Sequence, residues 1–352
     1  MTRSSRFEVT GRLSCAAGAF ALSLALASCG GGEPPPRDAT LTADPPLAPS
    51  GAPQADDGAA KTEVQRGIAF IKLEKYADAK AHLELAMSTR PTAEAAFYLG
   101  VASEKTGDRK GAEEAYKRAF ALDGRTVEAA GNLAALYLEP AAPGDKPRVD
   151  EAIAILKDAT SRSPDDVRLL QNLAYAYGQK GDVESSSKAY EAALAKGENA
   201  ELRFAYGTML FEQKQPEKAA PELKKALDGA REDAPTLVTL GRMLGASKAY
   251  AECVRAFDRA IKLKATDPEW FVRRGTCRHE LKDEAGARAD YDQAAKVDPN
   301  FAAAHYYLGL SFLADHKPQS AAAELEKAKK LGAGTPIGKS AEAKLAELPK
   351  KK

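Results

Sequence analysis

Residues 200–228, AELRFAYGTMLFEQKQPEKAAPELKKALD, contain the pattern that decides the fold of this 352-residue chain. A small residue is followed after twelve positions by a second small residue, after four more by a large apolar residue and after three more by alanine: Gly207, Ala219, Leu223 and Ala226. Residues 268–297, PEWFVRRGTCRHELKDEAGARADYDQAAKV, keep the same spacing at Gly275, Ala287, Tyr291 and Ala294. Such self-similarity indicates a repeat protein.

The pattern recurs from residue 61 onward. Its first small residue falls at Gly67, Gly100, Ala134, Ala174, Gly207, Gly241, Gly275 and Gly309, so most copies are 33 or 34 residues long. The third copy is longer because of an insertion around residues 139–150, EPAAPGDKPRVD. Eight copies in phase predict one continuous array rather than separate globular domains.

The spacing predicts a pair of helices in each copy. Offsets of four and three place the small, large and alanine residues of the second segment on one helical face. Turn signals separate the two segments at Thr106-Gly107-Asp108, Lys180-Gly181-Asp182 and Gln215-Pro216. One helix pair cannot bury its apolar face alone, so each copy must cover its neighbour.

This pattern resembles the tetratricopeptide repeat family. The resemblance implies an all-α fold: a right-handed α-solenoid of about eight helix-turn-helix repeats over residues 61–334, closed by a capping helix and a basic tail in residues 335–352. The capping helix is expected from Ile337, Ala341, Leu345 and Leu348, which share one helical side. The tryptophan that the family often places early in the repeat is mostly absent, and Trp270 lies one position before it.

The N-terminal sequence is typical of a targeting signal. Three arginines precede the apolar run LSCAAGAFALSLALAS, which ends before Cys29. The sequence Leu26-Ala27-Ser28-Cys29 resembles the lipobox of bacterial lipoproteins, which implies a signal peptide in residues 1–28 and acylation of Cys29. Acyl chains on Cys29 would anchor the protein to a lipid membrane. Gly30 after the cysteine suggests, by analogy, the outer membrane facing the periplasm if the cell is Gram-negative.

Two other interpretations of the leader remain open. Ala25-Leu26-Ala27 also fits signal-peptide cleavage that releases a soluble exported protein, and the apolar run could remain as an uncleaved anchor. After the leader, residues 29–60 are rich in proline and glycine and are expected to form a disordered tether.

The charge balance argues against a nucleic-acid partner. The full chain has a formal net charge of +1, and residues 1–28 hold a surplus of two positive charges, so the remainder carries −1. Nucleic-acid binding proteins normally show a clear basic surplus or patch. The partners expected for this chain are other proteins or peptides, with no nucleic acid and no small-molecule substrate.

In the resembled family, the first helices of the repeats line a groove that receives peptides or partner helices. Carrying its groove positions over to this chain implies a partner-binding set of Phe97, Asn132, Asn172, Tyr175, Phe204, Phe211, Arg242 and Tyr306, with Val64 and Val272 among further positions. The alternative is that stacking buries several of these side chains. Asn132 and Asn172 occupy matching places in the third and fourth repeats. They either hydrogen-bond the backbone of a ligand or have a local structural role. The insertion is either a tolerated loop or a contact for a partner.

No catalytic or metal-binding pattern is found in the sequence. The four histidines lack metal-ligand spacing, and Cys277-Arg278-His279 offers too few ligands for a structural zinc ion. No phosphate-binding glycine loop or nucleophile elbow occurs, so neither an enzyme nor a cofactor is expected. We expect Cys253 and Cys277 to be small packing residues, although their pairing in an oxidising compartment stays open because sequence gives no distance.

Together these features predict a lipid-anchored scaffold of the bacterial cell envelope. The expected role is assembly or stability of an envelope complex, such as pilus, secretion or outer-membrane machinery. An adaptor that regulates envelope hydrolases, or a soluble exported binding protein, are the alternatives.

Overall fold

The computed structural model describes residues 57–348. The predicted signal peptide, Cys29, almost all of the predicted tether and Lys350-Lys351-Lys352 therefore lie outside the described residues. The predicted tether ended at residue 60, and that boundary was wrong because the first helix begins at Asp57. Ala60 already lies in the core of this helix pair.

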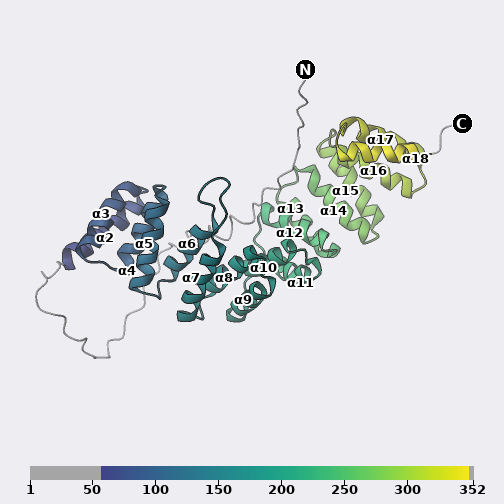
Figure 1. Ribbon diagram of the computed structural model, residues 1–352. Coiled ribbons are helices and arrows are strands. Elements are labelled where there is room, and N and C mark those ends of the chain that lie inside the picture. The colour runs from purple at the N-terminus through teal and green to yellow at the C-terminus, as the bar shows by residue number, and fades with distance from the viewer. Residues whose placement is uncertain (1–56, 349–352) are drawn as a thin grey trace, which may run out of the picture. The chain divides into compact units, whose positions relative to one another are not determined.

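The described residues are helical, with no strand among them (Figure 1). The helices are α2 (Asp57–Lys72), α3 (Tyr76–Thr89), α4 (Ala93–Lys105), α5 (Arg109–Leu122), α6 (Val127–Leu138), α7 (Val149–Arg162), α8 (Val167–Lys180), α9 (Val183–Lys196), α10 (Ala200–Glu212), α11 (Pro216–Asp228), α12 (Ala234–Ala246), α13 (Tyr250–Leu263), α14 (Pro268–Glu280), α15 (Glu284–Val297), α16 (Ala302–Ala314), α17 (Pro318–Leu331) and α18 (Pro336–Glu347). No helix in the described residues is both long enough and apolar enough to cross a membrane.

The chain divides into two compact units, Met1–Ala176 and Tyr177–Lys352, with the boundary inside α8. In the first unit α2 packs on α3, α4 on α5 and α6 on α7. In the second unit α10 packs on α11, α12 on α13, α14 on α15 and α16 on α17. Each pair is one copy of the sequence repeat, so the predicted α-solenoid architecture is confirmed.

The repeat's small residue lets its two helices approach closely. Beside Gly100 of α4 lies the ring of Tyr116 of α5, which is fully buried. The same pairing, sixteen residues apart, places large buried side chains against the other glycines, as in Gly207 with Leu223, Gly241 with Phe257 and Gly275 with Tyr291. The interior of each repeat is therefore set by one small residue and one large residue.

The turn inside most repeats contains one residue in the left-handed backbone region. It lies seven positions after the repeat's first small residue, and it is glycine in only two repeats: Glu74, Gly107, Gly181, Lys214, Lys248, Lys282 and His316. The left-handed conformation disfavours residues with a Cβ, so the five other turns each store a small strain. These repeats thus share the left-handed turn conformation even where the residue at this position is not glycine.

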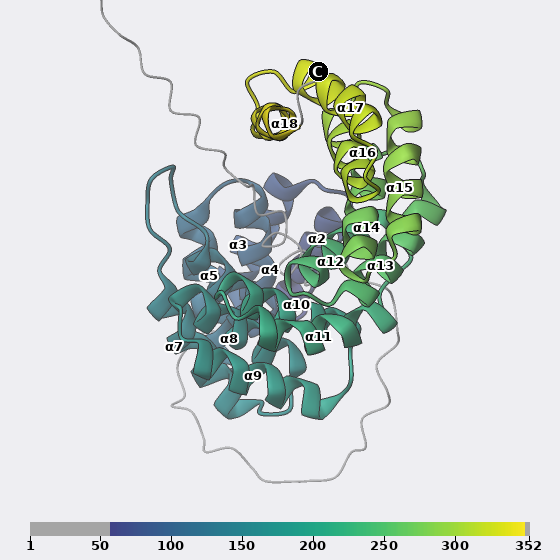
Figure 2. The same ribbon diagram turned by 90° about the vertical axis from the view of Figure 1, so that its right-hand side faces the viewer.

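Helix α18 closes the C-terminal end of the second unit (Figures 1 and 2). Ala341 is buried against Leu325 and Ala328 of α17, and Leu345 and Leu348 pack beside this cluster. The remaining α18 positions are mostly charged or small, so the helix covers the last repeat with a polar outer face, as solenoid ends require.

Candidate protein-interaction surfaces

In the first unit, the predicted groove residues Phe97 and Asn132 lie next to Tyr116. Asn132 donates from Nδ2 to the Tyr116 hydroxyl at 3.2 Å, and that hydroxyl donates to Glu104 at 2.8 Å. Burial, reinforced by the Glu104 carboxylate, raises the pKa of Tyr116 well above its usual range. The Phe97 ring lies edge-on to Tyr98, with centroids 5.2 Å apart. Asn132 therefore has a partner within the fold, and Phe97 is half-buried.

Asn172 is held against the preceding repeat. A Cβ built on Gly131 of α6 would lie 3.2 Å from the Asn172 side-chain nitrogen, so the absence of a side chain at residue 131 leaves room for this amide. Asn172 and its neighbour Tyr175 are both half-buried on α8. The two asparagines thus occupy matching places on adjacent first helices, but each already has a neighbour within the fold.

In the second unit, the predicted residues differ in how exposed they are. Phe204 and Phe211 of α10 are half-buried, and Arg242 of α12 is exposed. Tyr306 of α16 packs against the cluster formed by α17 and α18, so the terminal helix covers part of it. The eight predicted residues are distributed over six helices, with four residues in each unit.

Two of the further groove predictions were wrong. Val64 is only 5% exposed and packs against Ala86 and Ala95, and Val272 is 5% exposed within the core of the seventh repeat. The alternative that stacking buries first-helix side chains therefore applies to these two valines. Their positions face a neighbouring helix pair rather than solvent.

The insertion forms a loop, residues 139–148, between α6 and α7, and it projects from the first unit (Figure 1). The predicted insertion ended at Asp150, but Val149 and Asp150 already belong to the first turn of α7. All ten loop residues are exposed. Despite this exposure, both ends of the loop contact neighbouring helices: Glu139 contacts α5, and Arg148 contacts α5 and α6.

Two arginines fasten the loop. Arg109 of α5 donates to the carbonyl oxygens of Leu136 and Glu139, which the end of α6 leaves without helical partners. Arg148 donates to Glu113 at 2.8 Å and to Glu151, and its guanidinium lies 4.2 Å from the centre of the Tyr137 ring. Each arginine therefore joins the loop to α5.

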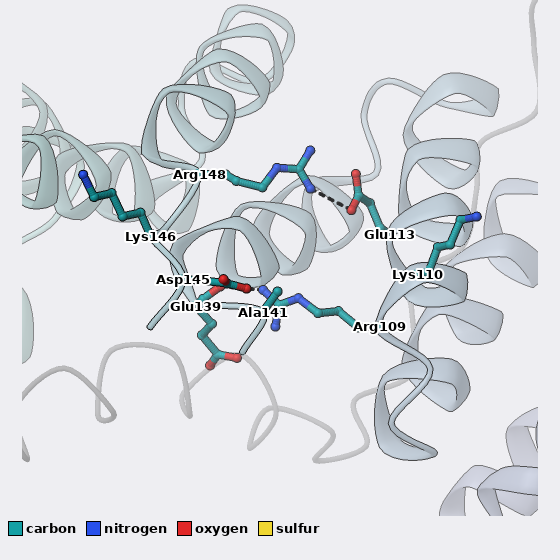
Figure 3. A pocket seen from close by; sticks show the side chains of 8 residues that line it. All are labelled: Arg109, Lys110, Glu113, Glu139, Ala141, Asp145, Lys146 and Arg148. Carbon is teal, nitrogen blue, oxygen red and sulfur yellow. Dashed lines mark hydrogen bonds and ion pairs between the residues drawn. The ribbon is translucent and has the colours of Figure 1, made fainter. Parts of the chain in front are cut away.

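A hollow of about 440 Å³ lies between α5 and this loop (Figure 3). Four cations, three carboxylates and one alanine line it: Arg109, Lys110, Lys146, Arg148, Glu113, Glu139, Asp145 and Ala141. Arg148 and Glu113 point toward each other across it, while Lys110 and Lys146 point outward (Figure 3). The charges nearly balance and the two arginines are already engaged, so the hollow is suited to a polar protein contact rather than to a small anion.

The Glu113–Arg148 contact makes a pH-dependent contribution to stability. Hydrogen bonding from Arg148 lowers the pKa of Glu113 to about 2. A carboxyl group whose pKa is lower in the folded chain stabilises it above the unfolded pKa, and the contribution is lost as pH falls through the folded pKa. Because Glu113 is partly solvated, we expect about 1 kcal/mol at pH 6.

We therefore expect Glu113→Gln to lower the free energy of unfolding by about 1 kcal/mol at pH 6, with the difference vanishing toward pH 2. Urea denaturation at several pH values measures it. Glu114→Gln is the matched control, since the side chain of Glu114 is 71% exposed on the same helix. An equal effect of the two variants at pH 6 would contradict this assignment.

Comparisons with known proteins identify the fold. A tetratricopeptide repeat model matches residues 64–124, 172–235 and 285–336, which together make up half of the chain. The chain belongs to the tetratricopeptide repeat family. Proteins of this family mediate protein–protein interaction, so the chain is a protein-binding module, and nothing in the comparisons indicates catalysis. No curated protein sequence matches the chain.

Solved tetratricopeptide repeat structures resemble this chain. The C-terminal part of a repeat-containing protein from Cytophaga hutchinsonii is 15% identical, with 70% of this chain and 98% of that chain covered and a TM-score of 0.54. A thermophilic tetratricopeptide repeat protein from Thermus thermophilus is 23% identical, with 53% and 99% covered and a TM-score of 0.41. Yeast Tom70 is 16% identical, with 86% and 66% covered and a TM-score of 0.43. The Cytophaga hutchinsonii structure supports the shared repeat fold.

The tetratricopeptide repeats also contain polar pairs that the sequence analysis missed. A first-helix residue bonds a second-helix residue nineteen positions later in three repeats: Glu63 with His82, Arg203 with Glu222 and His305 with Glu324. The interval of nineteen residues is present in the sequence. It was missed because it occurs in only some copies and joins different residue types in each. These pairs join the two helices of one repeat.

Within residues 57–348, no group of three or more histidine, cysteine, aspartate or glutamate side chains is arranged to hold a metal ion. His279 instead pairs with Glu284, at 2.8 Å. The cysteine expectation was wrong: Cys253 and Cys277 form a disulfide, with an S–S distance of 2.00 Å. Stacking of consecutive repeats brings their Cα atoms to 6.4 Å, a proximity that their separation of 24 residues does not reveal.

Proposed function

We propose that this protein is a membrane-anchored scaffold of the bacterial cell envelope, which binds partner proteins through the first helices of its repeats and assists assembly or stability of an envelope complex. The observation that carries the proposal is the array of helix pairs belonging to a protein-binding family, preceded by the lipobox-like sequence at Cys29. The lipidation of Cys29, the envelope location and the identity of the complex are parts of the proposal.

The first helices supply the contact chemistry of the proposed surface. Phe204 and Phe211 lie seven residues apart on α10 and keep part of each ring accessible. Arg242 on α12 is exposed, which adds a positive group to the same unit. Phenylalanine and arginine are both enriched in protein interfaces relative to the rest of the surface. We therefore assign these three residues to the partner-binding surface.

Capture of partners in the native cells tests this proposal. Tagged full-length protein is crosslinked and recovered from the membrane fraction, alongside Phe204→Ala/Phe211→Ala. We expect one envelope complex with the wild-type protein and at least a ten-fold lower yield with the double variant, since loss of two central aromatic side chains costs more than about 1.4 kcal/mol of binding free energy.

The matched control is Leu122→Ala/Leu263→Ala, which removes two exposed apolar side chains from second helices, 41% and 47% exposed. Capture by this control should equal that of the wild-type protein. Circular dichroism of both double variants checks that the helices remain folded. Equal capture by all three proteins would exclude the first-helix surface.

The same fractionation tests the anchor. We expect wild-type protein in the membrane fraction and Cys29→Ser protein in the soluble extract, because the serine variant cannot receive the thioether-linked lipid. Cys29→Ser protein that remains with the membranes would contradict lipid anchoring. Processed wild-type protein in the soluble extract would favour the alternative of a soluble exported binding protein.

A further inference from the structure

The Cys253–Cys277 disulfide joins consecutive repeats in the second unit. Cys253 lies on α13, the second helix of the sixth repeat, and Cys277 lies on α14, the first helix of the seventh. Cys253 occupies the position that is alanine or serine in other repeats, such as Ala219 and Ala287. The pair therefore adds a covalent link to a contact that the other repeats make by packing alone.

The neighbouring helix makes room for this link. A Cβ built on Gly245 of α12 would lie 3.2 Å from both sulfur atoms. The equivalent position holds larger residues in most other repeats, including Ile71, Phe211 and Leu313, and is glycine again at Gly178. The absence of a side chain at residue 245 therefore leaves the space that the two sulfur atoms occupy.

Both cysteines are inaccessible once the repeats have packed. Cys253 is 1% exposed and Cys277 is 5% exposed. A large oxidising protein cannot reach thiols buried to this extent, because disulfide exchange requires direct attack of one sulfur on another. The bond must therefore form while α13 and α14 are still open, which means during folding.

The cysteine content of the chain leaves one pair for such oxidation. Of the four cysteines, Cys15 belongs to the proposed leader and Cys29 to the proposed lipid attachment, so only Cys253 and Cys277 remain as thiols after processing. Structural disulfides form in oxidising compartments and are rare in the reducing cytoplasm. An exported chain with two thiols has a single possible pairing and needs no isomerisation.

We propose that Cys253 and Cys277 are the substrate thiols of an extracytoplasmic thiol oxidase, a protein with an active-site disulfide, which acts on this chain as it folds. This inference rests on the export that the proposed function includes, but not on the partner-binding surface. Cys253 leaves the translocation machinery first, 24 residues ahead of Cys277, so it is the first thiol to meet the oxidase.

The exchange takes two balanced steps. The Cys253 thiolate attacks the oxidase disulfide, which forms a mixed disulfide and releases one oxidase thiolate. The Cys277 thiolate then attacks the Cys253 sulfur, which forms the intramolecular bond and releases the second oxidase thiolate. The chain loses two electrons and two protons, and the oxidase disulfide accepts them to become a dithiol.

Thiol trapping of the full-length protein in its native cells tests the proposal. Cells are quenched with acid, and thiols are labelled with a maleimide of known mass under denaturing conditions, without and with prior reduction. We expect the processed wild-type chain to bind no maleimide before reduction and two after it. Cys277→Ala should accumulate a larger, reductant-sensitive adduct through Cys253, whereas Cys253→Ala/Cys277→Ala should form none.

The outcomes separate this inference from the proposed function. Processed chain with both thiols free would overturn the inference and leave the scaffold intact. A disulfide in the wild-type chain without any adduct from Cys277→Ala would overturn the role of the oxidase. Unprocessed chain with free thiols would overturn export, and with it both proposals. Processing is measured in the same samples by mass spectrometry.

Discussion

Gly100→Ala is expected to destabilise the protein by about 2–3 kcal/mol, although a glycine-to-alanine change inside a helix usually stabilises by about 0.5–1 kcal/mol. The added Cβ would lie 2.5 Å from two ring atoms of Tyr116. That ring is fully buried, and its hydroxyl is held by Glu104 and Asn132, so it cannot move aside without breaking these bonds. Urea denaturation, followed by circular dichroism, measures the change.

Gly197→Ala is the control for this prediction. Gly197 lies after the end of α9, its φ of 175° is extended, and a Cβ there meets no atom within 4 Å. Its effect on the free energy of unfolding should stay within about 0.5 kcal/mol of zero. Stabilisation by Gly100→Ala would show that the α4–α5 approach is looser than the structure describes.

Asp290→Ala should destabilise the protein by about 3–5 kcal/mol. Asp290 of α15 is 2% exposed and accepts hydrogen bonds from Arg274 and Arg278 of α14. Removing the carboxylate leaves two arginines, with 15% and 24% of their side chains exposed, without this buried partner. Asp258 still pairs with both arginines, but the loss of a buried carboxylate partner costs far more than the loss of an exposed ion pair.

Asp258→Ala is the control variant. It removes a second carboxylate, which pairs with the same two arginines. The side chain of Asp258 is 47% exposed, so water replaces it and the expected loss is below about 1 kcal/mol. Both variants are measured by urea denaturation at pH 7. Equal losses would contradict the assignment of Asp290 as the buried centre of this network.

The repeat fold was predictable because each helix pair is specified locally. The interval of sixteen residues between a small residue such as Gly275 and a large residue such as Tyr291 is present in the sequence and is also the contact that closes the pair. The turns were less visible, since Lys214 and Lys282 adopt the left-handed conformation without a glycine to signal it.

The contacts between repeats were harder to predict. Whether Val272 faces solvent, and whether Cys253 reaches Cys277, depends on the rotation between consecutive helix pairs. That rotation results from many side chains together, so no short pattern encodes it. Asn132 illustrates the same limit, because its bond to Tyr116 of the preceding repeat could not be predicted from its position in the pattern.

Site-specific photocrosslinking tests the central claim, protein binding by the first helices, most directly. A photoreactive amino acid is placed at Arg242, exposed on first helix α12, or at Lys188, whose side chain is 71% exposed on second helix α9. After illumination of the native cells, the account predicts a discrete crosslinked envelope protein from residue 242 and none from residue 188. The same product from both positions, or a product from residue 188 alone, would contradict it.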